Sequence, residues 1–363
     1  MAYHHIPYEE LKAFCERVFI GYGFTPEDAG KITDVLLAAD LYGIESHGVQ
    51  RLIRYHQEFL WGYVKLGAVP EIVKETPVSA TVDGHDMAGQ TLGIWCMEKA
   101  IEKARQSGIG MVAVRNCNHF GIAGYYARMA MEQGLLGVAM TNAEAIMVPT
   151  FGAQAMVGTN PIAVAMPADP VPFAFDSATT VVPRGKLEVF AKREGAIPDG
   201  WAIDEEGNPC TDAPRVLHNI INCVGGGILP LGGAGEQTSG YKGYGFGVIV
   251  DLFTAMLSGG LTSNYIYRTE GRADISQFYM AIDPGLFGDP QEIRDHFSFF
   301  LQQLRDSRKA KGQERIYTHG EKAQMNKDRA LREGIPVNDK TYGEMKMIAE
   351  YCGCADALPA LAD

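Results

Sequence analysis

The sequence predicts an α/β fold in which polar residues gather where the strands end. The clearest unit is the apolar run Met111–Val114, which is bounded by Gly110 and Arg115 and is typical of a buried strand. Apolar residues recur at helical spacing from Ile122, and Gly134 ends that pattern. Strand and helix patterns of this kind alternate through the middle of the chain. In open α/β sheets the ligand site lies at strand ends, so the functional residues are expected there.

The individual elements follow from apolar spacing and from turn residues. Near the N-terminus, Thr25 is a suitable N-cap, and Pro26 suits the first position of the helix that follows. Helices are expected over residues 8–22, 25–39, 91–107, 122–133, 187–193, 246–257, 293–307, 322–332 and 342–351. Strands are expected over residues 79–83, 111–114, 135–140, 162–167, 173–180 and 278–282.

Composition excludes several classes of protein. A chain of 363 residues exceeds one usual core, so two lobes are expected. The net charge of −12 argues against nucleic acid and anionic membrane as partners. Seven scattered cysteines without a C-x-x-C pair favour a reducing cytoplasm over a disulfide framework or a metal site. The N-terminus resembles no signal peptide and no apolar run reaches 18 residues, so no membrane partner is expected.

A first candidate site is the segment from residue 46 to residue 51. Gly43 and Gly48 bracket the pair Ser46 and His47, and Arg51 follows one helical turn later. The serine hydroxyl can orient the imidazole, and a guanidinium matches a carboxylate in two-point geometry. The alternative is a glycine-flanked helix junction with a capping serine. A serine hydrolase is a weaker option, because the segment has one residue too many for G-x-S-x-G.

A second candidate site is the turn between the strand at residues 111–114 and the following helix. This turn, Asn116–Gly121, carries His119 at its tip. Free N–H groups at a helix start favour an anion, and a histidine beside them can transfer a proton near neutral pH. The alternative is a histidine that only caps the turn. No G-x-G-x-x-G or P-loop motif occurs, so a Rossmann fingerprint is not supported, although the glycine-rich segment 225–245 suggests a close approach to a ligand or a partner chain.

Six motifs in order give the sequence a family resemblance. They are Ser46–Arg51, Asn118–Gly121, Gly158–Pro161, Asp176–Ala178, Gly240–Gly245 and Ala281–Pro284. Together they resemble the malate/L-lactate dehydrogenase family, whose members lack the usual Rossmann fold and include ureidoglycolate, sulfolactate and diketogulonate dehydrogenases or reductases. The resemblance covers about residues 7–335.

The resemblance implies an NAD- or NADP-dependent oxidoreductase acting on a small 2-hydroxy or 2-oxo carboxylic acid, with malate/oxaloacetate or lactate/pyruvate as the expected pair. It implies a mixed-sheet NAD(P)-binding α/β domain over residues 76–299. It also implies a helical lobe made from both termini, residues 1–75 together with 300–363. A homodimer is expected. A Ser/His hydrolase and a catalytically silent binding protein stay open as alternatives from other classes.

The resemblance also assigns roles to individual residues. It implies that Ser46 and His47 form a proton relay, that His119 contributes at the active site, and that Arg51 and Thr159 bind the substrate. The two histidines cannot be ranked from the sequence. The cofactor positions it implies are Phe120, Gly121, Thr141, Asp176, Ser177, Ala178, Lys242, Gly320 and Glu321. Two departures are notable: Ser177 replaces a methionine common in relatives, and Lys186 falls where cyclic-imine reductases have an acid, which disfavours that activity.

Overall fold

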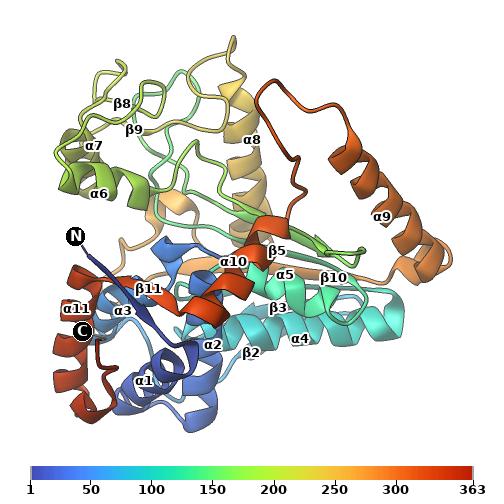
Figure 1. The fold of residues 1–363 in the computed structure, drawn as a ribbon, viewed down its shortest axis with the longest axis horizontal. Coiled ribbons are helices and arrows are strands. Elements are labelled where there is room, and N and C mark those ends of the chain that lie inside the picture. Colours follow the sequence, from blue (N-terminus) through green and yellow to red (C-terminus); the bar gives the residue numbers. More distant parts are fainter. Residues whose placement is uncertain (1, 362–363) are drawn as a thin grey trace.

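The computed structural model describes residues 2–361 and confirms an α/β fold built on a mixed seven-stranded sheet (Figure 1). The strand order is β2-β3-β4-β10-β5-β6-β7. Within this sheet only β3 and β4 are parallel, and the other neighbouring pairs are antiparallel. The strands are β2 (Glu71–Glu75), β3 (Ser79–Asp83), β4 (Ile109–Cys117), β5 (Leu136–Thr141), β6 (Ile162–Met166), β7 (Phe173–Ser177) and β10 (Ile275–Ile282).

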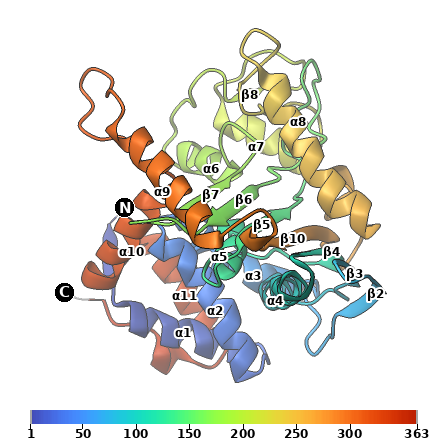
Figure 2. The ribbon, with the colours of Figure 1, turned by 90° about the vertical axis from the view of Figure 1, so that its right-hand side faces the viewer.

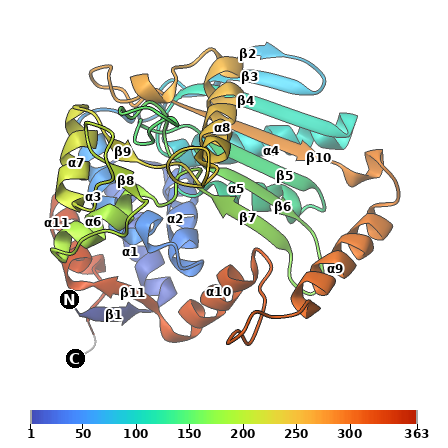
Figure 3. The same ribbon diagram turned by 90° about the horizontal axis from the view of Figure 1, so that it is seen from above.

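Helices cover both faces of the sheet (Figure 3). On one face, α4 (Gly89–Ser107) and α5 (Ala123–Met131) bury the aromatic rings of Tyr126 and Tyr279 in the largest apolar cluster. On the other face lies α8 (Gly240–Asp251), which continues into a π-helical turn at Leu252–Met256. The predicted helix at 246–257 was therefore correct in type but began too late. Of the helices within residues 2–361, none is both long enough and apolar enough to cross a membrane.

Residues from both ends of the chain share a second apolar cluster. Phe14 and Val18 of the N-terminal helices pack in the same cluster as Val337 and Ile348 near the C-terminus. The elements involved are β1 (Tyr3–Ile6), α1 (Tyr8–Gly21), α2 (Pro26–Leu41), α3 (Leu52–Leu60), α10 (Glu321–Glu333), β11 (Ile335–Asn338) and α11 (Asp339–Tyr351). The division of the chain into two lobes stays a prediction. Residues 1, 362 and 363, which were assigned to the helical lobe, lie outside the described residues.

The two strands β1 and β11 were not predicted from the sequence. They pair antiparallel, with Tyr3 opposite Asn338 and Ile6 opposite Ile335, and so join the two ends of the chain. Each strand has four residues, and β1 consists mostly of polar residues. A run of that length shows no periodicity, so its partner 330 residues away in the sequence decides its conformation.

The chain between β7 and α8 forms a small unit of its own. It contains α6 (Arg184–Lys192), β8 (Ala202–Ile203), α7 (Ala213–Asn222) and β9 (Gly227–Ile228). Leu187, Val216 and Ile228 are buried in its apolar cluster. Figures 1 and 2 place α6 and α7 across from the helices of the chain ends, while α9 (Pro290–Asp306) extends along another side of the molecule.

Candidate active site

The turn that carries His47 rests on the C-terminal end of α2. The carboxylate of Asp40 accepts a hydrogen bond of 2.7 Å from the N–H of Val49. Gly48 lies directly against that carboxyl group, and a β-carbon at this position would overlap it. This contact explains the glycine, and it fixes Ser46 and His47 just before α3. The side chains of these two residues are joined, with 2.9 Å between Ser46 Oγ and His47 Nδ1.

The turn that carries His119 also rests on α2. Gly121 has a φ of +84°, and a β-carbon there would lie 2.7 Å from Cγ1 of Val35. Only glycine combines this left-handed conformation with so close an approach. Phe120, predicted to contact a cofactor, has its ring buried in the core, where it stacks on Tyr126 at 4.8 Å. Its backbone alone is left for contact with a ligand.

The two predicted histidines come together. Their rings are stacked, with centroids 5.6 Å apart and planes inclined by 23°. Burial, together with the nearby Arg51 and Arg54, lowers the pKa of His47 to about 3. Burial, followed by the nearby Arg54, His47 and Arg51, also holds the pKa of His119 well below its ordinary value. Both imidazoles are therefore neutral at physiological pH.

Two arginines stand beside these histidines, and they differ in their partners. Arg54 donates to the carboxylate of Glu58 at 2.7 Å and to the hydroxyl of Tyr267 at 2.6 Å. Within residues 2–361, Arg51 has no carboxylate partner, and its Nε is buried without a hydrogen bond. A buried cation without an anion is costly. The arrangement therefore suits an external anion at Arg51.

The opposite wall of this site is the start of α6. A β-carbon on Gly185 would lie 3.5 Å from the β-carbon of Ser46, so the two backbones face each other closely. Lys186, one of the two departures from the family resemblance, is exposed, and its ammonium lies 5.8 Å from the ring centre of Trp201. This position therefore offers a cation and no acid.

Predicted cofactor residues gather at the end of β7. Asp176 is exposed, and its Oδ2 accepts a hydrogen bond of 2.7 Å from the N–H of Gly124 in the first turn of α5. The anion at this helix start is thus a carboxylate of the chain itself, where the sequence suggested an external ligand. Ser177 and Ala178 follow in the chain, half-buried at the same edge.

The turn with Gly320 and Glu321 docks on the same strand. The carbonyl of His319 accepts a hydrogen bond of 3.1 Å from the N–H of Ala174. Glu321 is buried and paired with Arg305 at 3.3 Å and with Arg315. Its side chain therefore holds the turn together, and its backbone remains for other contacts.

The other predicted residues lie near the neighbouring strand ends. The carbonyl of Thr159 accepts a hydrogen bond of 2.8 Å from the N–H of Thr179, just beyond Ala178. Thr141 is buried at the end of β5, and its hydroxyl donates to the carbonyl of Asn142 at 2.9 Å. Lys242 is exposed on α8.

A buried polar network between these strand ends and α8 was not predicted from the sequence. Asp251 accepts hydrogen bonds from Asn142 and Asn160 at 3.1 Å each, and from the hydroxyl of Ser263 at 2.9 Å. The two asparagines occur in the Thr-Asn turns at residues 141–142 and 159–160, but their common partner lies far along the chain. The network fixes both turns relative to α8.

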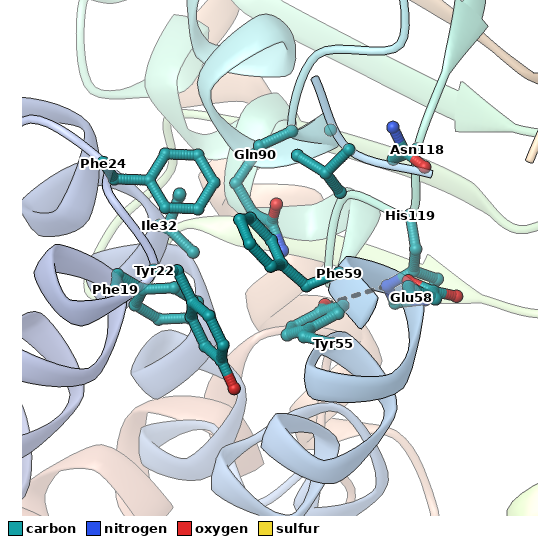
Figure 4. A pocket seen from close by; sticks show the side chains of 13 residues that line it. Phe19, Tyr22, Phe24, Ile32, Tyr55, Glu58, Phe59, Gln90, Asn118 and His119 are labelled. Carbon is teal, nitrogen blue, oxygen red and sulfur yellow. Dashed lines mark hydrogen bonds between the residues drawn. The ribbon is translucent and has the colours of Figure 1, made fainter. Parts of the chain in front are cut away.

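Tyr55 was also missed. Its hydroxyl lies 2.9 Å from Nδ1 of His119 (Figure 4). The available signal was spacing, because Arg51 and Tyr55 are four residues apart and share a helix face. Among the residues that the structure describes, the complete arrangement holds one cation without a carboxylate partner, two neutral imidazoles and one hydroxyl-bearing ring. Such a site can bind a carboxylate and move a proton next to it.

The chain is similar to known proteins over nearly its full length. The sequence profile described as malate/L-lactate dehydrogenase matches residues 6–346. The chain is 44% identical to the malate dehydrogenase of Pyrococcus abyssi over 352 residues, which covers 97% of this chain and 96% of that protein. It is 35% identical to the L-sulfolactate dehydrogenase of Methanocaldococcus jannaschii, with 92% of each covered. The crystal structure of malate dehydrogenase from Entamoeba histolytica matches with a TM-score of 0.93 and 32% identity over 97% of this chain and 98% of that one.

Proposed function

Because this chain belongs to the malate/L-lactate dehydrogenase family, we propose that it interconverts a small 2-hydroxy acid and its 2-oxo acid by hydride transfer with NAD or NADP. Malate and oxaloacetate are the preferred pair in this proposal, because the 44% identical relative is a malate dehydrogenase. Lactate and pyruvate are the second choice.

One observation carries the proposal: within residues 2–361, Arg51 is a cation without an anion, and it lies close enough to both imidazoles to lower the pKa of each. A 2-hydroxy acid supplies the missing carboxylate, and its reacting oxygen lies one carbon away from that carboxylate. A guanidinium fork would fix the acid by two hydrogen bonds. The hydroxyl is thereby directed towards the histidines, where a proton can be transferred.

The end of β7 fits a nicotinamide dinucleotide. Within residues 2–361, the one hydrogen bond of the Asp176 carboxylate is that from Gly124, so its other oxygen is open to ribose hydroxyl groups. The exposed Lys242 offers a positive charge for a phosphate. When bound, the nicotinamide supplies the hydride acceptor for oxidation and the hydride donor for reduction.

A spectrophotometric panel tests the proposal. The purified protein is mixed with NADH or NADPH and with oxaloacetate, pyruvate, or the 2-oxo acids that correspond to the relatives' substrates. We expect loss of the reduced-nicotinamide absorbance to be fastest with oxaloacetate. Preference for a sulfonated acid would favour the sulfolactate-type alternative, and the ureidoglycolate and diketogulonate types are tested in the same way. Ester hydrolysis without nicotinamide would support a Ser/His hydrolase, and binding without turnover a silent binding protein; either result would overturn the proposal.

A homodimer and a reducing compartment complete the proposal. The exposed side of α8 and its π-helical turn carries Phe246, Leu252 and Met256, each about half exposed. Apolar side chains clustered on one exposed face suit a second copy of the chain. All seven cysteines are free, which supports a cytoplasmic location.

A further inference from the structure

The two ring nitrogens of His119 have different surroundings. Nδ1 lies 3.3 Å from the backbone nitrogen of Gly121, whose N–H points towards it, and 2.9 Å from the hydroxyl of Tyr55. A backbone N–H can only donate a hydrogen bond, so Nδ1 must supply a lone pair. The Tyr55 hydroxyl must therefore donate to the same nitrogen. In the neutral ring the proton is left on Nε2.

The surroundings of His47 impose no such choice. Its Nδ1 faces the hydroxyl of Ser46 at 2.9 Å, and a serine hydroxyl both donates and accepts. His47 is therefore free to carry its proton on Nδ1 and keep a lone pair on Nε2. Within the described part of the chain, neither Nε2 has a hydrogen-bond partner, so both nitrogens are open to a ligand.

From this difference we propose that Tyr55 is a positioning residue, which with the N–H of Gly121 holds His119 in the tautomer that carries its proton on Nε2. The inference rests on the proposed function for its chemistry. His119 then donates a hydrogen bond to the reacting oxygen and does not accept a proton from it. Proton transfer falls to His47.

In the resulting step the proton and the hydride each have a named acceptor. In oxidation the hydroxyl proton of the 2-hydroxy acid passes to Nε2 of His47, which becomes an imidazolium with its Nδ1–H bonded to Ser46. C2 loses a hydride, whose acceptor is the nicotinamide named in the proposed function, and the C–O bond becomes a carbonyl. The N–H of His119 stays on its nitrogen throughout and stabilises the charge that develops on the oxygen.

The position of Tyr55 is fixed by its packing. The ring lies at the wall of a pocket lined mainly by apolar side chains, among them Phe19, Phe24, Ile32 and Phe59 (Figure 4). Burial raises the pKa of Tyr55, so the phenol keeps the hydrogen that it donates. Figure 4 shows its hydroxyl directed to His119.

The same pocket provides a matched control. Tyr22 also lines it, and the Tyr22 hydroxyl lies 2.5 Å from Nδ1 of His56. Tyr22 is thus a second tyrosine bonded to a histidine, at a place without a role in the proposed chemistry. Tyr22→Phe and Tyr55→Phe each remove one hydroxyl from this pocket, so they separate loss of a hydrogen bond in general from loss of the one at His119.

The first measurement is ¹⁵N NMR of the full-length protein with labelled histidine. We expect His119 of the unmodified chain and of Tyr22→Phe to show a protonated Nε2 and an unprotonated Nδ1. In Tyr55→Phe we expect the two nitrogen shifts of His119 to move towards each other, together with at least a tenfold loss of kcat and little change in KM. A proton on Nδ1 in the unmodified protein would overturn the proposal. So would a Tyr55→Phe variant that keeps both tautomer and kcat.

The second measurement compares glutamine at the two histidine positions. A glutamine amide places an N–H near the position of Nε2 but transfers no proton. His119→Gln should therefore lose about tenfold in kcat, whereas His47→Gln should lose about 10²-fold or more, the usual scale of acid–base catalysis. Equal losses would contradict the division of roles. If no acid is turned over at all, the proposed function fails, while the NMR result still decides the role of Tyr55.

Discussion

The stacked rings of His47 and His119 are brought together by α2, although the two residues are 72 positions apart in the sequence. Asp40 near the end of α2 holds the turn after His47, and Val35 in its middle contacts Gly121 after His119. One rigid helix thus sets the distance between the two rings. Their mutual position does not depend on a flexible loop.

We expect acidification to destabilise the protein through this pair. The pKa of His47 is about 3 in the folded protein, below its ordinary value of 6.5. Between these values the unfolded chain binds a proton that the folded protein excludes. Stability is therefore fully present above about pH 6.5 and is lost as the pH falls towards about 3, by up to about 1.4 kcal/mol per pH unit for one histidine.

Urea unfolding at several pH values measures this effect. His47→Gln lacks the titrating ring, so its free energy of unfolding should fall less steeply than that of the unmodified protein below about pH 6.5. His218→Gln, which replaces an exposed histidine on α7, is the control and should keep the original slope. Identical slopes for all three proteins would show that His47 is protonated without cost in the folded state.

For Asp176 we expect a loss of cofactor affinity when its charge is removed. Asp176→Asn keeps an oxygen for the N–H of Gly124, so α5 stays capped. A hydrogen bond to a charged group contributes about 1.5–3 kcal/mol, so the Kd for NADH or NADPH should rise roughly 10- to 150-fold. Fluorescence titration measures both constants. Asp169→Asn, an exposed residue bonded to Arg294, is the control, and an unchanged Kd in Asp176→Asn would remove Asp176 from the cofactor site.

The sequence was sufficient to predict those parts of the fold and site that depend on neighbours along the chain. The N-cap at Thr25 is confirmed, with its hydroxyl accepting from the N–H of Asp28 at 3.1 Å. Glycines beside His47 and His119 marked two tight turns, and the structure shows the contact that excludes a side chain at each turn. The choice between Arg51 and Arg54, in contrast, depends on Glu58 and Tyr267, and spacing alone could not have shown that these two residues pair with Arg54.

Contacts between segments that are distant in the sequence could not be predicted from the sequence. Asn142 and Asn160 are ordinary turn residues in the sequence, and Asp251 is one polar residue in an apolar helix. Their structural role comes from hydrogen bonds between segments about 100 residues apart in the sequence. A single sequence contains no local signal for such contacts. The same reason explains the missed pairing of β1 with β11.

The network around Asp251 leads to a stability prediction. Asp251→Ala removes the acceptor of four hydrogen bonds, from the side-chain amides of Asn142 and Asn160 and from the hydroxyl and backbone N–H of Ser263. The Ser263 hydroxyl can still donate to Oδ1 of Asn160, so three buried donors lose their acceptor. Each unsatisfied buried donor costs about 1–3 kcal/mol, so the free energy of unfolding should fall by at least about 3 kcal/mol. Chemical denaturation measures the loss. Asp295→Ala on exposed α9 should change it by less than about 0.5 kcal/mol, and an equally small effect at Asp251 would contradict a structural role for the network.

The exposed face of α8 leads to a prediction about assembly. Leu252 is 50% exposed in the midst of this apolar face, so Leu252→Asp places a charge at the proposed dimer contact. Sedimentation should show a dimer for the unmodified protein and a monomer for the variant. Val73→Asp alters an equally exposed side chain, 48%, on β2 and outside α8, and this variant should stay dimeric. A monomeric unmodified protein with full activity would remove the dimer from the proposal.

The final prediction concerns Arg51, whose Nε has no hydrogen-bond partner within residues 2–361. Arg51→Lys keeps the positive charge but loses the planar fork that holds a carboxylate at two points. At about 1.5–3 kcal/mol for a charge-assisted hydrogen bond, kcat/KM for the 2-oxo acid should fall roughly 10- to 150-fold. Cofactor affinity should barely change, because Arg51 is assigned to the acid.

Arg54→Lys separates this role from a general effect of removing a guanidinium. Arg54 is only three positions away, but its guanidinium already donates hydrogen bonds to the carboxylate of Glu58 and to the hydroxyl of Tyr267. Arg54→Lys should therefore lower Tm more than Arg51→Lys does, because within residues 2–361 Arg51 has no such partners to lose. Arg51→Lys should in turn lower kcat/KM more than Arg54→Lys does. Steady-state kinetics, cofactor titration and thermal unfolding of both variants give the comparison. If Arg51→Lys turns over the acid as fast as the unmodified enzyme, the carboxylate is bound elsewhere and Arg51 is an ordinary residue of the turn before α3.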